Sequence, residues 1–318
     1  MDISIIVPIY NEEESLGELC RWISDVVKEN NFTYEIILLD DGSSDSSWSR
    51  IRQLSQEVPA VKGVRFRRNY GKAAALQAGF DAAQGQVVIT MDADLQDSPD
   101  EIPHLYKMIK EQGYDLVSGW KKKRYDPMIK KISSKLFNLV TRIMSNIPLH
   151  DFNCGLKAYK RSVVKNIELY GEMHRYIPVI VKQAGFTNFG EKVVNHRQRK
   201  YGKTKYGTLR FVYGFLDLLS ITFVTRFSKS PMHFFGTLGI IIFTIGFFAS
   251  VWLGVEKLYY VSMNIKAPLI TSKPFFYIAL VDMILGTQLF LTGFLGELMA
   301  RSFHKKGQCL IEDMVNVK

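Results

Sequence analysis

The feature that most constrains this chain is Met232 to Val255, a run of 24 residues that carries no formal charge. About 20 apolar residues in a helix suffice to cross the hydrocarbon core of a bilayer. A second apolar run, Pro274 to Gly296, is interrupted only by Asp282. Two buried core helices are the alternative, but the length of both runs and their near absence of charge favour transmembrane helices. The residues before Met232 are then expected to form a domain in water.

Charged side chains around the two apolar runs predict their orientation. The outer flanks carry five basic residues, whereas the link between the runs carries three, Lys257, Lys266 and Lys273. This bias, together with the large polar domain, predicts that both termini lie in the cytoplasm. Asp2 to Pro8 reads as a strand without a basic leader, so we expect no signal peptide. Asp282 is costly in lipid, and a helix contact and the handling of a lipid headgroup are equally open roles for it.

The positive charge of the chain is clustered. Lys and Arg number 41 against 31 Asp and Glu, a net charge of +10. Lys121 to Lys135 holds seven basic residues and one acid, and Arg197 to Lys229 holds eight and one. Such clusters indicate an anionic partner, which phosphate groups, lipid headgroups or nucleic acid would each satisfy. Nucleic acid is disfavoured because the basic residues flank the apolar runs. Three widely spaced cysteines favour reduced thiols over a disulfide framework or a zinc site.

Apolar β-branched runs alternate with helical patterns through the first part of the chain. Ile3 to Val7 is continuous, as in a strand buried on both faces of a parallel sheet. The alternation, with short connections, predicts an α/β domain with a doubly wound, mostly parallel sheet. The expected strands are residues 3–7, 35–40, 61–66, 87–91, 115–118, 155–159 and 192–196. The expected helices are residues 15–27, 46–56, 72–83, 99–111 and 132–143, and an amphipathic helix in the membrane interface at 206–227.

One of these strands ends in two carboxylates, at Asp92-Ala93-Asp94. Side chains i and i+2 of an extended segment point the same way, so Asp92 and Asp94 are expected to aim at one point. Ligands of open α/β sheets bind at the carboxyl ends of the strands, where Asn11 and Asp41 also fall. Two hard oxygen donors there suit Mg²⁺ or Mn²⁺. A polar turn is the alternative, since Asp is common in turns.

Four ordered motifs resemble those of family 2 inverting glycosyltransferases. They are Pro8-Ile9-Tyr10-Asn11-Glu12, Asp40-Asp41-Gly42-Ser43-Ser44-Asp45, Asn69-Tyr70-Gly71-Lys72 and Asp92-Ala93-Asp94-Leu95-Gln96. The chain is most similar to polyprenyl-phosphate hexose synthases of the dolichol-phosphate mannose synthase type, in particular the bacterial members with two C-terminal transmembrane helices. The likeness covers nearly the whole chain. It implies a GT-A-type fold and assembly into a homotetramer.

The resemblance implies roles for residues of these motifs. Asp92 and Asp94, with Gln96, would hold Mg²⁺ or Mn²⁺ against the donor's diphosphate, where a cation offsets the charge of the leaving group. Asp41 resembles the carboxylate that recognises the nucleobase, although a structural role in the turn is as open. Lys72 would contact the diphosphate, with a solvated lysine as the alternative. The implied nucleotide-binding residues are Pro8, Tyr10, Glu12, Asp41, Lys72, Asp92 and Ala93.

Asp151 begins the segment Asp151-Phe152-Asn153-Cys154-Gly155, which resembles the family's Asp-x-x-[Ser/Cys]-Gly loop beside the reacting centre. A phosphate acceptor is already an anion, so it does not strictly require a general base. We therefore expect Asp151 to orient the donor sugar or the acceptor, with the general base and a plain loop cap as alternatives. Asp94 and Asp151 are the expected catalytic residues.

Basic residues are expected to bind the phosphate of the acceptor. Arg199 to Tyr206 resembles the family's Arg-x-x-Gly-x-Ser-Lys segment, with Thr204 in place of Ser. Arginine grips phosphate bidentately, whereas lysine acts as a point charge. A basic flank that only attracts anionic lipid is the alternative. Relatives often have Arg two residues after the glycine that matches Gly119, where this chain has Lys121. The candidate residues are Lys121, Arg124, Lys131, Lys135, Arg199 and Lys205.

These features predict the inverting transfer of a hexose, from UDP-glucose, to undecaprenyl phosphate at the cytoplasmic face of the inner membrane. The expected partners are a nucleotide sugar, the polyprenyl phosphate, the membrane and further copies of the chain. The expected organisation is a glycosyltransferase domain at residues 1–200, juxtamembrane amphipathic helices at 201–230, two transmembrane helices with a short external loop at 231–300 and a cytoplasmic tail at 301–318.

Three other functions fit parts of the pattern. The donor could instead be GDP-mannose or a modified aminosugar nucleotide. A processive polysaccharide synthase usually carries a Gln-x-x-Arg-Trp stretch, and this sequence contains none. A membrane-anchored protein that binds nucleotide sugars without turnover would have lost the Asp-x-Asp pair, which is intact here.

Overall fold

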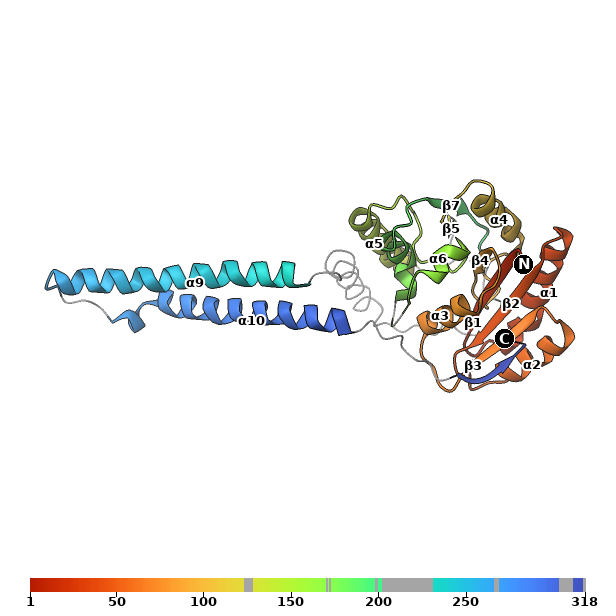
Figure 1. Ribbon diagram of the computed structural model, residues 1–318, viewed down its shortest axis with the longest axis horizontal. Helices are drawn as coiled ribbons and strands as arrows, with labels where there is room; N and C mark the ends of the chain where they lie inside the picture. The colour runs from red at the N-terminus through yellow and green to blue at the C-terminus, as the bar shows by residue number, and fades with distance from the viewer. Residues whose placement is uncertain are drawn as a thin grey trace. The chain divides into compact units, whose positions relative to one another are not determined.

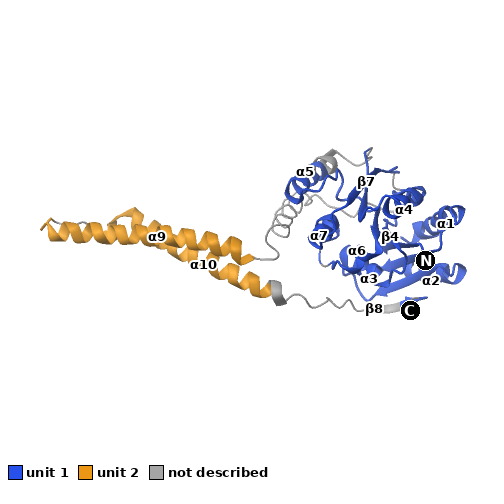
Figure 2. Ribbon diagram, turned by 45° about the horizontal axis from the view of Figure 1, so that its top comes forward, with its two compact units in different colours: residues 1–221, 307–318 blue, residues 222–306 orange. Residues whose placement is uncertain are grey.

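The computed structural model of the chain divides into two compact units, coloured separately in Figure 2. Unit 1 comprises residues 1–221 and 307–318, and unit 2 comprises residues 222–306. Residues 307–318, which lie within the tail expected at residues 301–318, belong to unit 1. The structure describes residues 1–122, 128–169, 171, 173–197, 200–201, 231–265, 269–302 and 311–316.

In the described part of unit 1, eight strands form one mixed sheet in the order β7-β5-β6-β4-β1-β2-β3-β8. β6 runs antiparallel to both its neighbours, β8 runs antiparallel to β3, and the other pairs are parallel. The sheet is thus mostly parallel, as predicted. The strands are β1 (Ile3–Ile9), β2 (Tyr34–Asp40), β3 (Val61–Phe66), β4 (Val87–Thr90), β5 (Leu116–Trp120), β6 (Lys157–Lys160), β7 (Phe189–Val193) and β8 (Ile311–Val315).

Helices cover both faces of this sheet (Figure 1). Successive side chains of a strand point to opposite faces, so Ile5 packs in the layer with α1, α2 and α4, whereas Ile6 packs in the layer with α3, α6 and α7. The helices of unit 1 in the described residues are α1 (Glu13–Glu29), α2 (Ser47–Glu57), α3 (Lys72–Ala82), α4 (Ile102–Lys110), α5 (Met128–Ser145), α6 (Arg161–Lys165) and α7 (Ile177–Gln183), with 3-10 turns η1 (Pro99–Glu101) and η2 (Met173–Tyr176).

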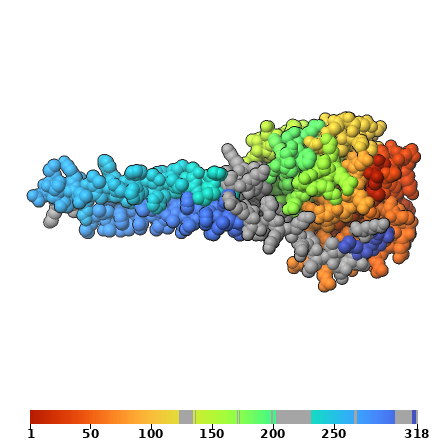
Figure 3. Space-filling view, in the orientation of Figure 1, coloured from red at the N-terminus to blue at the C-terminus, as the bar shows by residue number. Residues whose placement is uncertain are grey.

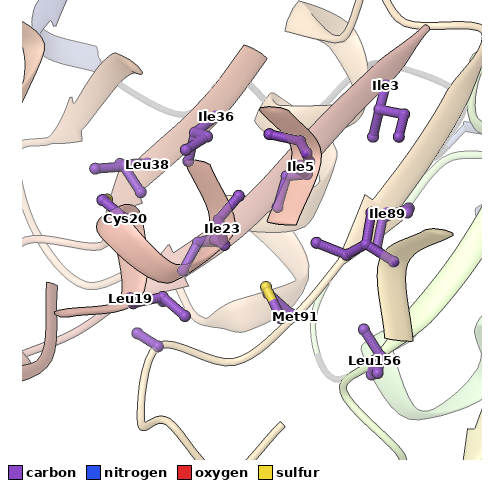
Figure 4. Close-up of a cluster of buried hydrophobic side chains, with 14 of the residues drawn as sticks. Ile3, Ile5, Leu19, Cys20, Ile23, Ile36, Leu38, Ile89, Met91 and Leu156 are labelled. Carbon is purple, nitrogen blue, oxygen red and sulfur yellow. The ribbon is translucent and has the colours of Figure 1, made fainter. Parts of the chain in front are cut away.

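The buried strands carry the apolar core that fixes the sheet. Ile3 and Ile5 of β1 face Ile36 of β2, Ile89 of β4 and Ile23 of α1 (Figure 4). Each of these side chains is fully buried. Burying a side chain of this size contributes about 1.5–3 kcal/mol, so these contacts stabilise the centre of the sheet.

The outermost strand, β8, was not predicted from the sequence. It pairs antiparallel with β3, and its blue residues lie on the surface against orange residues of the N-terminal half (Figure 3). Asn316 Nδ2 donates to the carbonyl oxygens of Ser55 (3.0 Å) and Val61 (3.3 Å). Val315 packs against the main core. The strand character of this short segment comes from pairing with a sheet edge, which local sequence does not report.

Two other elements differ from the predicted positions. The strand expected at residues 192–196 is β7, which starts earlier because Gly190 packs on the ring of Tyr114 and lies beside Val117 of β5. The strand expected at 155–159 begins at Lys157, since Gly155 packs against the side chain of Asp92, as described below. The amphipathic helix expected at 206–227 lies outside the described residues.

Unit 2 is a hairpin of two long helices, α9 (Pro231–Ser262) and α10 (Pro274–Ser302), with the short turn η3 (Ile270–Ser272) before α10. Both helices are long and apolar enough to cross a membrane. Glycines let the two backbones touch. A Cβ on Gly239 would lie 2.6 Å from the carbonyl oxygen of Gly286, and one on Gly246 would lie 2.6 Å from that of Ala279. The helices form adjoining bands in Figure 3, with most large apolar side chains exposed.

Candidate active site

The predicted motifs meet at one edge of the sheet. β1, β2 and β4 are parallel, and Ile9 lies opposite Asp40 at the carboxyl ends of β1 and β2. The loops that leave these ends carry the Asn11, Asp41 and Asp92 motifs. This is the edge at which open α/β sheets bind their ligands.

Hydrogen bonds join the first motif to the second. The N–H of Asn11 donates to Ser43 Oγ (2.9 Å), and the N–H of Ser44 donates back to Asn11 Oδ1 (2.8 Å). The N–H of Glu12 donates to Ser47 Oγ (3.0 Å). Asn11 has a φ of +53°, a left-handed conformation that asparagine tolerates better than most residues. The loops after β1 and β2 therefore form one polar surface.

Asp41 joins the second motif to the third. Its Oδ1 accepts the N–H of Tyr70 (2.7 Å) and its Oδ2 accepts that of Gly71 (2.9 Å). Gly42 has a φ of +70°, and a Cβ there would lie 2.7 Å from the backbone nitrogen of Asn69, so the two loops touch. Burial raises the pKa of Asp41, and the two N–H donors partly offset this. Asp40 accepts the N–H of Ser43 (2.9 Å) and so stabilises the turn after β2.

Lys72 joins the third motif to the fourth. It begins α3 directly after Gly71, and its ammonium forms an ion pair with Asp92 Oδ1. Burial by itself disfavours the carboxylate of Asp92, but Lys72, together with Lys121 and Lys157, outweighs it and lowers the pKa of Asp92 to about 2. Asp92 is therefore ionised at neutral pH.

Asp94 lies among other carboxylates. Burial raises its pKa, and the charges of Asp92 and Asp97 raise it further, to about 6. The N–H of Gln96 donates to Asp94 Oδ1 (3.2 Å). Lys121 Nζ lies 2.6 Å from Asp97 Oδ1, and both side chains are largely buried, with 12% and 0% exposed. Lys121 thus neutralises Asp97 and lowers the negative potential around the Asp92–Asp94 pair.

The loop that begins at Asp151 closes this edge. The carbonyl of Gly155 accepts Thr90 Oγ1 (2.9 Å), and a Cβ on Gly155 would lie 2.6 Å from Cγ of Asp92. Asp151 is buried, and its backbone carbonyl accepts Ser118 Oγ (3.0 Å). All five motifs are therefore connected by direct contacts, in the order in which they occur in the sequence.

The Asp92–Asp94 pair fits a hard divalent cation. Burial and mutual repulsion both disfavour two ionised carboxylates, and a cation held between them would remove both penalties. In the part of the chain that the structure describes, no three His, Cys, Asp or Glu side chains are grouped to hold a metal by themselves. The remaining ligands would come from phosphate and water, as Mg²⁺ and Mn²⁺ accept. Gln96 lies in the same turn.

The rest of the predicted nucleotide-binding residues lie along the same edge. Tyr10 follows β1 directly and is 39% exposed, so its ring presents a surface at the mouth of the site. Pro8 and Glu12 are half-buried on either side of it. Ala93 is buried between the two aspartates. The assignment of these residues to the nucleotide stays a prediction.

The predicted acceptor-phosphate residues are only partly described. Lys121 is paired with Asp97, and Lys135 is exposed on α5. Lys131 lies in α5, but its side chain is not among the described ones. Arg124, Arg199 and Lys205 lie outside the described residues. Their assignment to the acceptor therefore stays a prediction.

Two basic side chains near the aspartate pair were not predicted. Lys157 is 3% exposed, donates to the carbonyl of Cys154 and has a pKa that burial lowers. His174 is half-buried in η2, and burial lowers its pKa to about 3, with the charges of Lys72 and Arg175 acting in the same direction. Lys157 follows the Asp151–Gly155 motif by two residues, and this closeness in sequence is a signal that could have identified it. His174 comes to the site only through tertiary packing.

Comparison with known proteins agrees with this geometry. Residues 4–168 match the family described as Glycosyl transferase family 2. The chain is 36% identical to a dodecaprenyl-phosphate galacturonate synthase of Rhizobium johnstonii, over 96% of this chain and 89% of that protein. It is 33% identical to an undecaprenyl-phosphate 4-deoxy-4-formamido-L-arabinose transferase of Aeromonas hydrophila, over 95% and 89%.

Solved structures share the fold. Glucosyl-3-phosphoglycerate synthase of Mycobacterium tuberculosis, in complex with Mn²⁺ and UDP-glucose, gives a TM-score of 0.56 at 17% identity, over 70% of this chain and 78% of that one. Mannosyl-3-phosphoglycerate synthase of Rubrobacter xylanophilus gives 0.57 at 15% identity, over 71% and 75%. The fold is thus of the GT-A type, as expected from the motifs. The family match, the relatives and the connected strand-end motifs all agree: this chain belongs to glycosyl transferase family 2.

Proposed function

We propose that this protein transfers a sugar from a nucleotide-sugar donor to the phosphate of a polyprenyl phosphate at the cytoplasmic face of the membrane, with inversion at the anomeric carbon. One observation carries the proposal. Lys72 and Gly155 both contact Asp92. The motif that ends at Lys72, which is predicted to contact the donor diphosphate, and the Asp151 loop therefore meet at a single carboxylate. A donor held there would have its leaving group and its anomeric carbon beside the same cluster.

The residues of the site suit the charges of this reaction. An oxygen of the acceptor phosphate bonds to C1 of the sugar, while the bond from C1 to the donor diphosphate breaks and a nucleoside diphosphate leaves. Asp92 and Asp94 would hold Mg²⁺ or Mn²⁺, whose charge would offset that of the leaving diphosphate. Lys72 lies against Asp92 at the start of α3, where it would add positive charge beside the phosphates. Asp151 would orient the sugar or the acceptor, because the acceptor oxygen is already anionic.

The acceptor is proposed from the relatives and from unit 2. Both relatives described above are named for polyprenyl phosphates and match over nearly their whole lengths. β3 precedes α9 in the chain and β8 follows α10, yet the two strands pair in one sheet. The chain therefore enters unit 2 from unit 1 and returns to unit 1 after it. Two crossings then leave both ends on one side, and the charge bias of the flanks favours the cytoplasm. Assembly into a tetramer stays a prediction of the resemblance.

Helix α5 also supports a position at the membrane surface. Leu139 and Ile143 lie four residues apart on one face of α5 and are 51% and 70% exposed. Lys135 is exposed on the same helix. Exposed apolar residues at helical spacing, combined with basic residues, are typical of helices that lie in the membrane interface. An acceptor phosphate at the headgroup level would then be close to the site.

The donor sugar has four candidates. UDP-glucose is the donor predicted from the sequence. The relatives are named for galacturonate and 4-deoxy-4-formamido-L-arabinose, which favours a carboxylated or modified sugar. Purified protein in detergent with undecaprenyl phosphate and Mn²⁺ should be screened against UDP-glucose, GDP-mannose and nucleotide sugars that carry these two sugars. The donor is the one that yields a glycolipid at the highest kcat/KM.

The decisive variant is Asp94→Ala. We expect it to lower transfer by at least about 100-fold, the scale set by removing a group that stabilises charge in a transition state. Asp25→Ala, an exposed acid on α1, is the matched control and should leave transfer unchanged. A wild-type protein that makes no glycolipid with any donor, or an Asp94→Ala protein with near-normal turnover, would refute the proposed function.

A further inference from the structure

A single carboxyl group holds the start of the Asp151 loop. Glu191 lies on β7, the edge strand next to β5, opposite Ser118. Its Oε1 accepts the N–H of His150 (2.6 Å) and the N–H of Asp151 (3.0 Å). Its Oε2 lies 2.6 Å from Nδ1 of His150. The side chain of Glu191 is 12% exposed, and that of His150 is 48% exposed, so the bond to the N–H of Asp151 is the more buried part of this contact.

The other contacts of this loop act in the same direction. The ring of His150 stacks on Trp120 at the end of β5, with centroids 4.2 Å apart and planes 13° apart. Ser118 Oγ donates to the carbonyl of Asp151 (3.0 Å). Asp151 is thus held from its amide side by β7 and from its carbonyl side by β5. The Asp151 carboxyl group also accepts the N–H of Asn153 (3.1 Å), which closes the turn toward Gly155.

We propose that Glu191 is a positioning residue for the transfer reaction, which it serves by fixing Asp151 relative to Asp92. This inference rests on the proposed function. Glu191 bonds to the backbone of the loop. Its effect on the substrates would be indirect, through the positions of Asp151 and Asp92. The distance from Asp151 to Gly155 is only four residues, so a shift at Asp151 reaches the glycine that packs on Asp92.

The position of Glu191 predicts a selective kinetic defect. Without its carboxyl group, the backbone N–H groups of His150 and Asp151 lose their acceptor, and the part-buried one of Asp151 can regain a partner only if the loop shifts. A displacement of about 1 Å at a reacting group lowers turnover about 100-fold. The nucleoside end of the site is built from the loops after β1 and β2, which Glu191 does not contact. We therefore expect kcat to fall about 10- to 100-fold for Glu191→Ala, while the KM for the donor changes less than about threefold.

Glu191→Gln separates hydrogen bonding from charge. The glutamine carbonyl can still accept both N–H groups, and its NH₂ can donate to Nδ1 of neutral His150. We expect this variant to retain at least half of the wild-type kcat. Asp115→Ala is the matched control. Asp115 also accepts a backbone N–H, that of Asn188 (3.1 Å), and a bond from the ammonium of Lys160 (2.9 Å), but at the other end of the β5–β7 pair.

The experiment measures kcat, the donor KM, the Kd for UDP by calorimetry and the melting temperature for the full-length wild type and the three variants in detergent. A loss of kcat in Glu191→Ala with unchanged Kd for UDP, rescue in Glu191→Gln and normal kcat in Asp115→Ala would support the role. Wild-type kcat in a folded Glu191→Ala, or equal loss in Asp115→Ala, would overturn it while leaving the proposed function intact. A wild type without transfer would overturn both.

Discussion

The backbone of Gly155 packs directly against the side chain of Asp92: a Cβ on the glycine would lie 2.6 Å from Cγ of the aspartate. Asp92 cannot move aside freely, because Lys72 holds Oδ1 from the other side. Glycine is required here by close approach alone, since its φ is not positive.

Gly155→Ala is therefore expected to displace the Asp92 carboxylate. Transfer should fall about 10- to 100-fold, because a small misplacement at a reacting centre costs that much, and the Mn²⁺ concentration for half-maximal activity should rise. Gly254→Ala is the control, because a Cβ there meets nothing within 4 Å. Activity within about twofold of wild type for Gly155→Ala at all Mn²⁺ concentrations would contradict the arrangement.

The raised pKa of Asp94 predicts that its ionised carboxylate destabilises the folded protein. The pKa lies at about 6 in the folded protein against an ordinary value of 3.8, so the folded state binds the proton more tightly than the unfolded one. Stability from this group is present at low pH and is lost as pH rises through about 6. Asp94→Asn cannot ionise. In the absence of metal it should melt at a higher temperature than wild type at pH 8, and no higher at pH 4.

Metal addition completes this test. Mn²⁺ held by Asp92 and Asp94 would stabilise the folded state by mass action, so its addition should raise the melting temperature of wild type at pH 8. Asp94→Asn lacks one carboxylate and should show a much smaller shift. Equal Mn²⁺ shifts in both proteins would show that the cation binds elsewhere.

The sequence predicted where the motifs lie more readily than the local structure that carries them. The alternating strand pattern predicts that Asp92 and Asp94 point the same way, but β4 ends at Thr90 and both aspartates lie in the turn that follows it, with Leu95 at a φ of +60°. The agreement at the strand ends reflects topology, because parallel strands bring their carboxyl ends to one edge whatever the local detail. The hydrogen bonds that hold Asp41 to Tyr70 depend on how two loops pack, and the sequence carries no such signal.

Residues far from a motif were harder to foresee. Glu191 reaches the Asp151 loop because β7 and β5 pair in a particular register, with Glu191 beside Ser118. That register is set by packing of the whole sheet, since the segment before Glu191 alternates weakly in hydrophobicity. His174 comes near Lys72 because η2 packs on α3. Such residues are visible only once the tertiary structure brings the strands and helices together.

Asp41→Asn tests the loop that Asp41 supports. The amide would turn an NH₂ group toward the N–H of either Tyr70 or Gly71, which leaves one buried donor without an acceptor and costs about 1–3 kcal/mol. We expect a lower melting temperature without nucleotide and a weaker Kd for UDP. Weaker binding with an unchanged melting temperature would assign Asp41 to the nucleobase alone. Asp81→Asn, on the exposed surface of α3, is the control.

The C-terminal strand offers the last test, because β8 covers an edge of the sheet that would otherwise present unpaired backbone groups. Truncation of the membrane-anchored chain after residue 310 should lower its melting temperature and promote its self-association through β3, measured by light scattering in detergent. Asn316→Ala removes the two bonds to Ser55 and Val61 and should give a smaller loss, about 1 kcal/mol in the free energy of unfolding. Because β3 leads to the loop of Asn69 to Lys72, we also expect truncation to weaken binding of UDP; a truncated protein that melts, stays dispersed and binds UDP like wild type would show that β8 is dispensable.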